Sequence, residues 1–473
     1  MATNTEQVCE HSNLYLNVSP HASKAGFKRA TERQRILAAT KDGRFRKNLN
    51  LLTPKELFED EMTFPGPLVL PDDDLAEDPE CPPQDFREWR DEEERNPVTR
   101  ERKTIYIIPS PTIMPEVSKM TKWSECRRQN ATQEKEQDAT REFNTQQQLE
   151  AIADHPKGQD ILEYLSAFFH GMDVKPFEKP FRWQKWDKYA GGILKSPNTE
   201  RRIGLLAPNN ELFGIRCRLS PDGVSPMQVN LDDILDALAE NIPPDAHSVM
   251  MLLHMDMYEG DGDVFTAGRA YGGSRIAAVS LFRDNPLCAP HDDGHAWPSS
   301  HCAAYIDQLC LEASSPPSKQ TGRQPSSRPR QDSGGPLHVA IEAAAVNAKR
   351  KIPLEASSVQ WLERTVVTMA HELCHCLGLD HCTYFACAMQ GCANLDEAQR
   401  QPPYLCPVCL EKLCTAIGEG TRNGFVRERY EALRRVCERW GDASVSRMFA
   451  GYKAWLDAVI ERSPGGDVMV IEN

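Results

Sequence analysis

The residues best suited to chemistry lie between His371 and His381, in the segment HELCHCLGLDH. On a helix, His371 and His375 lie one turn apart on the same face, so both imidazoles can reach one ion. Neutral imidazole nitrogen is a ligand that suits zinc. Glu372 stands beside the first ligand, where it can reach a water molecule without ligating the metal. We therefore identify Glu372 as the candidate general base.

The spacing after the second histidine extends this site. A straight helix would carry His381 away, but Gly378 can adopt the left-handed conformation that ends a helix and turns the chain. That turn would return His381 as a third ligand of the same ion. Three protein ligands leave a fourth position open, which is the arrangement of a catalytic zinc rather than a structural one. A helix that contains these histidines by chance is the alternative.

Four cysteines directly after this motif form a second candidate site. They are Cys382, Cys387, Cys406 and Cys409. Two short pairs separated by a loop, here C-x4-C and C-x2-C, are typical of a structural zinc site, in which four thiolates close the coordination shell. Unliganded core thiols are the alternative, and Cys392 or Cys414 could replace a ligand. Cys374 and Cys376 lie inside the first motif; Cys374 is expected to pack beside the site, and a redox or inhibitory role is the alternative.

The two sites together resemble a known family. The pattern H-E-x-x-H-x-x-G-x-x-H is the metzincin signature, and the following segment HCTYFACAMQGC…YLCPVC is similar to the archaemetzincins, the eukaryotic branch in particular. The resemblance implies a catalytic zinc on His371, His375 and His381, with Glu372 as acid/base. It implies a second zinc on the four cysteines. It also implies a methionine in a tight turn beneath the catalytic zinc, and Met389 is the candidate for that methionine.

The surrounding elements must position these residues. The apolar stripe of residues 357–377 predicts one long helix that carries the first two histidines. Residues 248–257 indicate a buried strand, and 263–269 with 275–282 indicate a hairpin that turns at Gly272 and Gly273. Further strands are expected at 104–108 and 202–206, and further helices at 160–170, 231–241 (capped by Asn230), 425–440 and 449–459. These elements indicate the α+β class, and the resemblance implies a zincin/metzincin-like catalytic domain with a mixed sheet.

Composition suggests three regions along the chain. Residues 1–100 combine a basic stretch with an acidic, proline-rich one and are expected to be largely disordered. The catalytic domain is expected over 101–440, with a disordered insertion at 284–336, and a C-terminal helix and tail over 441–473. The insertion holds a second set of possible ligands, which we interpret as a polar loop: Cys288, His291, Asp292, Asp293, His295, His301 and Cys302.

Overall composition limits the classes of partner. The chain has 473 residues and a formal net charge of -14, which argues against broad binding to nucleic acid or to anionic membrane. No apolar run of membrane-spanning length and no signal peptide are evident. The expectation is an intracellular protein, cytoplasmic, with a nuclear address left open by the basic stretch 24–47. In a reducing compartment, clustered cysteines favour metal over disulfides.

These patterns predict a hydrolase: a zinc metallopeptidase with two Zn²⁺ per chain, one catalytic and one structural. The expected substrate is a peptide or small protein, and the expected state is a monomer. The alternative is a zinc-stabilised interaction or scaffold protein with weak or vestigial peptidase activity. Glu372 favours the enzyme, because a purely structural site has no need of it.

Overall fold

The computed structural model describes residues 13–45, 51–127, 155–186, 201–286, 288, 294–312, 330–331, 334–346, 357–418, 422, 424–442 and 445–463. The chain divides into two compact units, each assembled from separated segments. Unit 1 comprises Met1–Glu92, His291–Lys351 and Leu379–Asn473, and unit 2 comprises Glu93–Pro290 and Ile352–Gly378. Helices and mixed sheets together confirm the expected combination of α and β structure.

A five-stranded sheet forms the centre of unit 2. Its order is β11 (Gly268–Tyr271), β12 (Ile276–Ser280), β9 (Ala246–Leu253), β2 (Thr104–Ile108) and β4 (Asp173–Pro176). Strands β12, β9, β2 and β4 pair in parallel, whereas the edge strand β11 runs antiparallel to β12. The predicted hairpin is therefore present, with the 3-10 turn η2 (Gly272–Ser274) between its strands.

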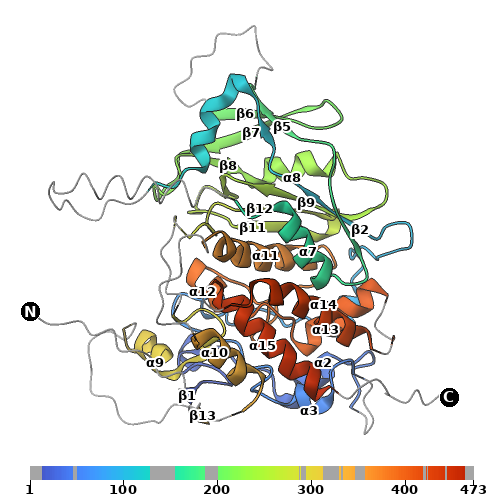
Figure 1. Ribbon diagram of the computed structural model, residues 1–473, viewed down its shortest axis with the longest axis vertical. Coiled ribbons are helices and arrows are strands. Elements are labelled where there is room, and N and C mark those ends of the chain that lie inside the picture. Colours follow the sequence, from blue (N-terminus) through green and yellow to red (C-terminus); the bar gives the residue numbers. More distant parts are fainter. Residues whose placement is uncertain are drawn as a thin grey trace, which may run out of the picture. The chain divides into compact units, whose positions relative to one another are not determined.

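The helices of unit 2 cover this sheet. Helix α11 (Ser357–His375) packs against β11, β12 and helix α7 (Gly158–Phe168), and α8 (Leu231–Ala239) packs against β12 (Figure 1). The indole nitrogen of Trp361 donates to the carbonyl of Leu281 at 2.7 Å, which ties α11 to the end of β12. Asn230 caps α8 by accepting from the amide of Asp233, as its position predicts.

A second sheet of six strands completes unit 2. Its order is β10 (Asp256–Tyr258), β8 (Gln228–Asn230), β7 (Leu212–Arg218), β6 (Arg201–Leu206), β5 (Arg182–Gln184) and β3 (Thr112–Ile113), and the 3-10 helix η1 (Pro115–Ser124) follows β3. The predicted single strand at 248–257 is divided between the two sheets, because β9 belongs to the first and β10 to the second. The predicted strand at 202–206 is β6.

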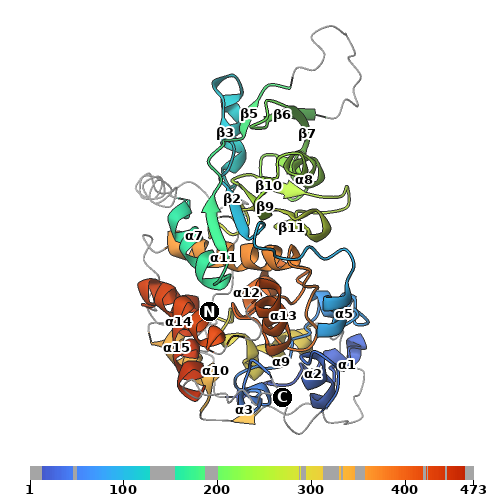
Figure 2. The same ribbon diagram turned by 90° about the vertical axis from the view of Figure 1, so that its right-hand side faces the viewer.

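Unit 1 is mainly helical. Its N-terminal part holds β1 (Asn13–Leu14), α1 (Ala22–Ala25), α2 (Glu32–Ala38), α3 (Lys55–Phe58), α4 (Asp74–Glu77) and α5 (Phe86–Asp91). Its later parts hold η3 (Ser299–His301), α9 (Ala303–Glu312), β13 (Arg330–Gln331), α10 (Pro336–Ala345), α12 (Leu395–Arg400), α13 (Pro407–Ile417), α14 (Phe425–Trp440) and α15 (Arg447–Arg462). Helices α10, α14 and α15 lie side by side (Figure 2).

The expectation of a largely disordered first hundred residues is wrong for 13–45 and 51–100. Phe58, Phe64, Phe86 and Trp89 are all at most 3% exposed. Composition failed here because a few large apolar side chains, spread among many charged ones, bury enough area to order the segment. This region belongs with the C-terminal residues in unit 1, so the expected boundaries at 100 and 440 do not match the compact units.

The expected disordered insertion also needs correction. Residues 294–312 are ordered and include the buried side chains of Trp297, His301 and Cys302. Most of its low-complexity second half, together with His291, Asp292 and Asp293, lies outside the described residues. Within the described part of the chain, no helix is long and apolar enough to cross a membrane.

Candidate metal centres

The predicted histidine pair is assembled on α11 in unit 2. The Nε2 atoms of His371 and His375 lie 3.0 Å apart, and their rings are nearly perpendicular, at 80°. Two ligands of a tetrahedral zinc, each about 2.0–2.1 Å from the ion, would lie roughly 3.3 Å apart. The observed separation is close to that value. The two imidazoles therefore fit a shared ion without rearrangement of the helix.

Glu372 lies on the same helix and is 7% exposed. Burial raises the pKa of its carboxyl to about 8, against the opposing effect of Arg269. Arg269 belongs to the edge strand β11 and forms an ion pair with Glu259 at 3.4 Å. Glu372 is thus a buried acid beside the histidine pair, a setting typical of catalytic carboxyls.

Gly268 on β11 makes room for Glu372. A Cβ at this position would lie 3.0 Å from the Cγ and 3.1 Å from the Oε1 of Glu372. It would also lie 3.2 Å from the Cγ2 of Val279, so it could not move away freely. Sequence reasoning did not single out Gly268, because its role depends on a strand and a helix that are about a hundred residues apart.

Replacing Gly268 with valine is expected to displace the Glu372 carboxyl and lower kcat/KM for a cleaved peptide by about 10–100-fold, since a displacement of about 1 Å can have that effect. Gly268→Ala should have a smaller effect. Tyr271→Val, on the same strand with 36% exposure, is the control for general perturbation of β11. Steady-state kinetics with zinc content measured in parallel tests this prediction. Equal activity in Gly268→Val and the wild type would contradict it.

The predicted helix-ending turn occurs at Gly378. Its φ is 82°, in the left-handed region, and its amide donates to the carbonyl of His375 at 2.9 Å. A Cβ there would lie 2.6 Å from the Cγ of Arg95, so glycine is required by both conformation and space. Gly378 is the last residue of unit 2, and His381 follows in unit 1, half-buried beside Gly391.

The four predicted cysteines come together in unit 1. Their sulfurs all lie within 4.8 Å of one another, and all four side chains are buried. The Sγ atoms of Cys382 and Cys406 are 3.6 Å apart. This is too long for a disulfide but close to the roughly 3.8 Å expected for two sulfurs about 2.3 Å from one tetrahedral zinc. Four thiolates so close would repel one another, so a dication among them fits the donor set.

Local backbone structure fixes these sulfurs. Cys406 is the N-cap of α13, with Pro407 in its first turn, and Cys409 lies in that turn. A helix N-terminus favours negative charge on both thiols. The Sγ of Cys387 accepts from the amides of Met389 at 3.5 Å and Cys406 at 3.2 Å. The loop between the two cysteine pairs is therefore held by hydrogen bonds to the Cys387 sulfur as well as by backbone hydrogen bonds.

Met389 lies within this loop and is fully buried. Its carbonyl accepts from the amide of Cys382 at 2.6 Å, which closes the loop directly after His381. Of the neighbouring thiols considered as alternatives, Cys392 is exposed and Cys414 is buried. Neither joins the sulfur cluster, and Cys374 and Cys376 are buried in unit 2. Among the described residues, no metal-ligand group forms in the 284–336 segment.

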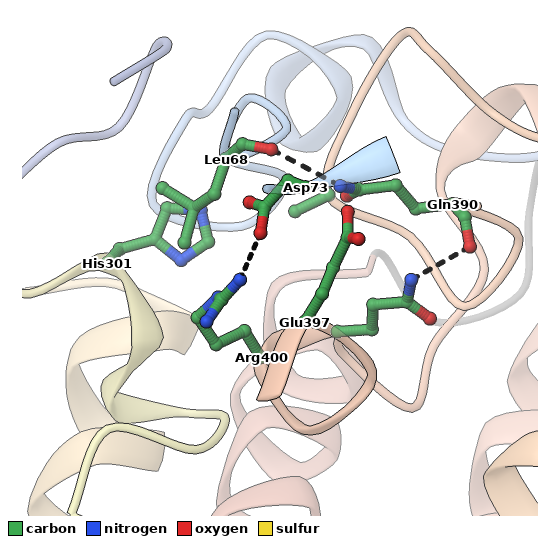
Figure 3. A pocket seen from close by; sticks show the side chains of 8 residues that line it. Leu68, Asp73, His301, Gln390, Glu397 and Arg400 are labelled. Atoms are coloured by element: carbon green, nitrogen blue, oxygen red, sulfur yellow. Dashed lines mark hydrogen bonds and ion pairs between the residues drawn. The ribbon is translucent and has the colours of Figure 1, made fainter. Parts of the chain in front are cut away.

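A buried polar cluster surrounds a small cavity that is also lined by Gln390, the residue after Met389 (Figure 3). Arg400 forms an ion pair with Asp73, and Glu397 accepts from the amides of Asp74 at 2.9 Å and Ala393 at 2.8 Å. Burial raises the pKa of Glu397 to about 8, with the Asp73 charge adding to the effect. The cavity between these groups has room for about one water molecule. These bonds tie the 68–74 segment to the loop that follows Met389.

His301 lines the same cavity and is 1% exposed. Its Nε2 lies 3.1 Å from the carbonyl of Gly66, so Nε2 carries the proton, and Nδ1 lies 3.1 Å from the Ser300 hydroxyl. Burial lowers the pKa of His301 from 6.5 to about 4. The unfolded chain therefore takes up this proton at a higher pH than the folded chain does.

The contribution of neutral His301 to the free energy of unfolding is therefore expected to be fully present above about pH 6.5 and to be lost as the pH falls towards 4. At pH 5 this loss should lower the free energy of unfolding by about 2 kcal/mol. His301→Gln keeps a donor but cannot take up the proton. Its stability deficit relative to the wild type should shrink by that amount between pH 7.5 and 5, measured by urea unfolding with zinc present. The control is His338→Gln, which replaces a partly exposed histidine instead of a buried one. A deficit that stays constant with pH would contradict the assignment.

Comparison with known proteins finds a match to one peptidase family. Residues 344–415, which contain both candidate sites, match the model of Peptidase family M54. This segment of the chain is similar to that peptidase family. The archaemetzincin relatives include archaemetzincin-2 of Homo sapiens, 29% identical over 253 residues, and archaemetzincin-1 of Mus musculus, 29% identical over 235 residues. The matched part covers 53% and 46% of this chain, respectively.

The match to these archaemetzincins is partial along their length as well. It covers 58% of the human relative and 38% of the mouse one, so the chain spans about half the length of the curated relatives it matches. A solved archaemetzincin from Methanopyrus kandleri is similar over 68% of this chain and 99% of its own, with 15% identity and a TM-score of 0.31. The family model does not include Arg29 and Pro65, which contact the loop between Cys382 and Cys387.

Proposed function

We propose that the chain is a zinc-dependent metallopeptidase that hydrolyses peptide bonds. The observation that carries this proposal is the buried Glu372 on the same helix as two imidazoles whose Nε2 atoms are 3.0 Å apart. A structural metal site has no use for a free carboxyl at that place, whereas a hydrolytic site requires a base there. The match of residues 344–415 to a peptidase family model supports the same class of reaction.

The proposed catalytic ligands are His371, His375 and His381. All three belong to the continuous segment 371–381 and qualify as a candidate metal-binding group. The turn at Gly378 supports the return of His381 after the helix ends, and three nitrogen ligands leave one coordination position open. Zinc bound there would supply Lewis-acid activation of a water molecule and of the peptide carbonyl.

The chain's own contribution to the reaction is proton transfer and positioning. Glu372 accepts a proton on a carboxylate oxygen as water attacks the peptide carbonyl, and it then donates that proton to the leaving amine. Gly268 allows the carboxyl to lie in this place, and the ion pair of Arg269 with Glu259 lies nearby in unit 2. Burial raises the pKa of the Glu372 carboxyl to about 8, which favours its uptake of a proton.

The four cysteines are proposed to hold a second, structural Zn²⁺, giving two ions per chain. Their closed shell of sulfur would stabilise the loop from Cys382 to Cys409 rather than act on substrate. Met389 is proposed as the methionine of a Met-turn, with a packing role. We further propose that the protein is a monomer and that its substrate is a peptide or small protein. Its proposed location is the cytoplasm or nucleus, where a reducing environment keeps thiols available for metal. The net charge of -14 disfavours binding to nucleic acid.

The alternative is an interaction or scaffold protein with weak or vestigial peptidase activity, held together by zinc. Zinc per chain, measured by mass spectrometry on purified protein, and cleavage of a peptide library separate the two. The peptidase proposal expects about two zinc ions per chain, cleavage products from the library, loss of cleavage with a chelator and recovery with added zinc. Two zinc ions without cleavage of any peptide would favour the scaffold.

A further inference from the structure

The loop between the first two zinc-binding thiols contacts the N-terminal segment of the chain. Tyr384 and Phe385 lie between Cys382 and Cys387, and the amide of Ala386 donates to the carbonyl of Pro65 at 2.9 Å. The Nε of Arg29 donates to the carbonyl of Tyr384 at 3.1 Å. A part of the sequence that lies outside the matched family segment therefore forms a wall of the four-cysteine centre.

Two guanidinium groups from this segment lie over one ring of that loop. The Cζ of Arg29 is 5.3 Å, and that of Arg35 is 5.2 Å, from the centre of the Phe385 ring. The Arg29 side chain is 4% exposed. Arg35 is held by a bond from its Nη1 to the carbonyl of Ala30 at 2.8 Å. Both cations are thus held over Phe385, in the loop between Cys382 and Cys387, with Arg29 buried and Arg35 half-buried.

Buried like charges repel, so this pair requires negative charge nearby. Arg29 is paired with Glu61 at 3.7 Å, and Glu61 is itself 32% exposed. Among the described residues the Nη2 of Arg29 is buried without a hydrogen-bond partner. Burial and the neighbouring charge of Arg35 lower the pKa of Arg29 to about 9, and Glu61 and the sulfurs of Cys382 and Cys406 act in the opposite direction. A zinc ion with four thiolates carries a net charge of about −2, which would balance both cations.

We propose that Arg29 is a positioning residue of the four-cysteine centre. The positive charge of Arg29, together with that of Arg35, offsets the excess negative charge of a zinc tetrathiolate. This inference rests on the proposed structural zinc. Arg29 does not ligate the metal. It holds the Tyr384 carbonyl and stabilises the ionised thiols, as charged groups outside a coordination shell do in other metal sites.

Cobalt substitution in the full chain tests this proposal. The sulfur-to-cobalt charge-transfer band reports on the four-cysteine site alone, because the other proposed site has only nitrogen ligands. Arg29→Met keeps most of the packing but removes the charge, whereas Arg29→Lys keeps the charge. Arg33→Gln, at an exposed position of helix α2, which follows Arg29 in the chain, is the control. The rate of cobalt loss to a chelator, and the pH midpoint of metal binding, are measured for each variant.

We expect Arg29→Met to lose cobalt about 10–100-fold faster than the wild type, with its binding midpoint shifted to higher pH. Arg29→Lys should retain most of the wild-type behaviour, and Arg33→Gln all of it. Wild-type rates in Arg29→Met, or equal losses in the lysine and methionine variants, would overturn the charge role. Absence of the charge-transfer band in the wild type would instead refute the proposed four-cysteine metal site itself.

Discussion

Glu372→Gln is expected to lower kcat/KM for a cleaved peptide by about 10²–10⁴-fold, the range that loss of a general base usually produces. Glutamine has nearly the same shape but cannot accept the proton from the attacking water. The residue does not ligate the metal, so the zinc content should stay at the wild-type value of about two per chain. Hydrolysis of a library-derived peptide, with zinc counted in both proteins, makes the comparison.

The size of this effect separates the two proposed functions. Glu372 is 7% exposed, and burial already favours its neutral form, so the amide should be accommodated without loss of stability. An unchanged melting temperature would show that any loss of activity is chemical. Activity equal to that of the wild type would exclude Glu372 as the base. Residual cleavage insensitive to chelator would identify a contaminating peptidase instead.

Cys406→Ser is expected to remove one zinc ion per chain and to destabilise unit 1 by at least about 4 kcal/mol, which is the scale of losing a structural metal. For a unit of this size the melting temperature should fall by roughly 10 °C. Cys406 is fully buried, caps α13 and lies 3.6 Å from Cys382, so serine leaves both a cavity and an incomplete coordination shell. Thermal unfolding and zinc analysis measure the two effects.

Cys414→Ser is the matched control, because Cys414 is equally buried and lies on the same helix outside the sulfur cluster. It should keep both zinc ions and lose much less stability. Cys392→Ser, at an exposed position, should be close to neutral. If Cys414→Ser lost a zinc ion and Cys406→Ser did not, the ligand assignment would be wrong at that position.

Short-range patterns were sufficient for the elements that carry the site. The apolar stripe and the glycine three residues after His375 predicted α11 and its end, and the structure has the helix over Ser357–His375 with Gly378 in the left-handed region. Cysteine spacing predicted the cluster of four sulfurs. In each case the deciding residues are close in sequence, so helical geometry or a short loop fixes their distances.

Long-range packing was not predictable in the same way. No pattern within residues 1–100 indicates that Phe64 stacks edge-on against Tyr404 at 5.7 Å, or that Arg29 contacts the loop of the first cysteine pair. Gly268 and His301 were missed as constraints for the same reason. Their neighbours, Glu372 and Gly66, lie 104 and 235 positions away. Such contacts depend on the whole topology rather than on local propensity.

The interleaving of segments in unit 1 has a consequence for how the protein is made. The indole of Trp455 donates to the carbonyl of Thr63 across 392 positions, and the first 92 residues share a core with Leu379–Asn473. During translation these early residues leave the ribosome long before their partners exist. Unit 1 is therefore expected to complete its core only after α15 has been synthesised. A truncation ahead of α15 should be more damaging than the small length lost would suggest.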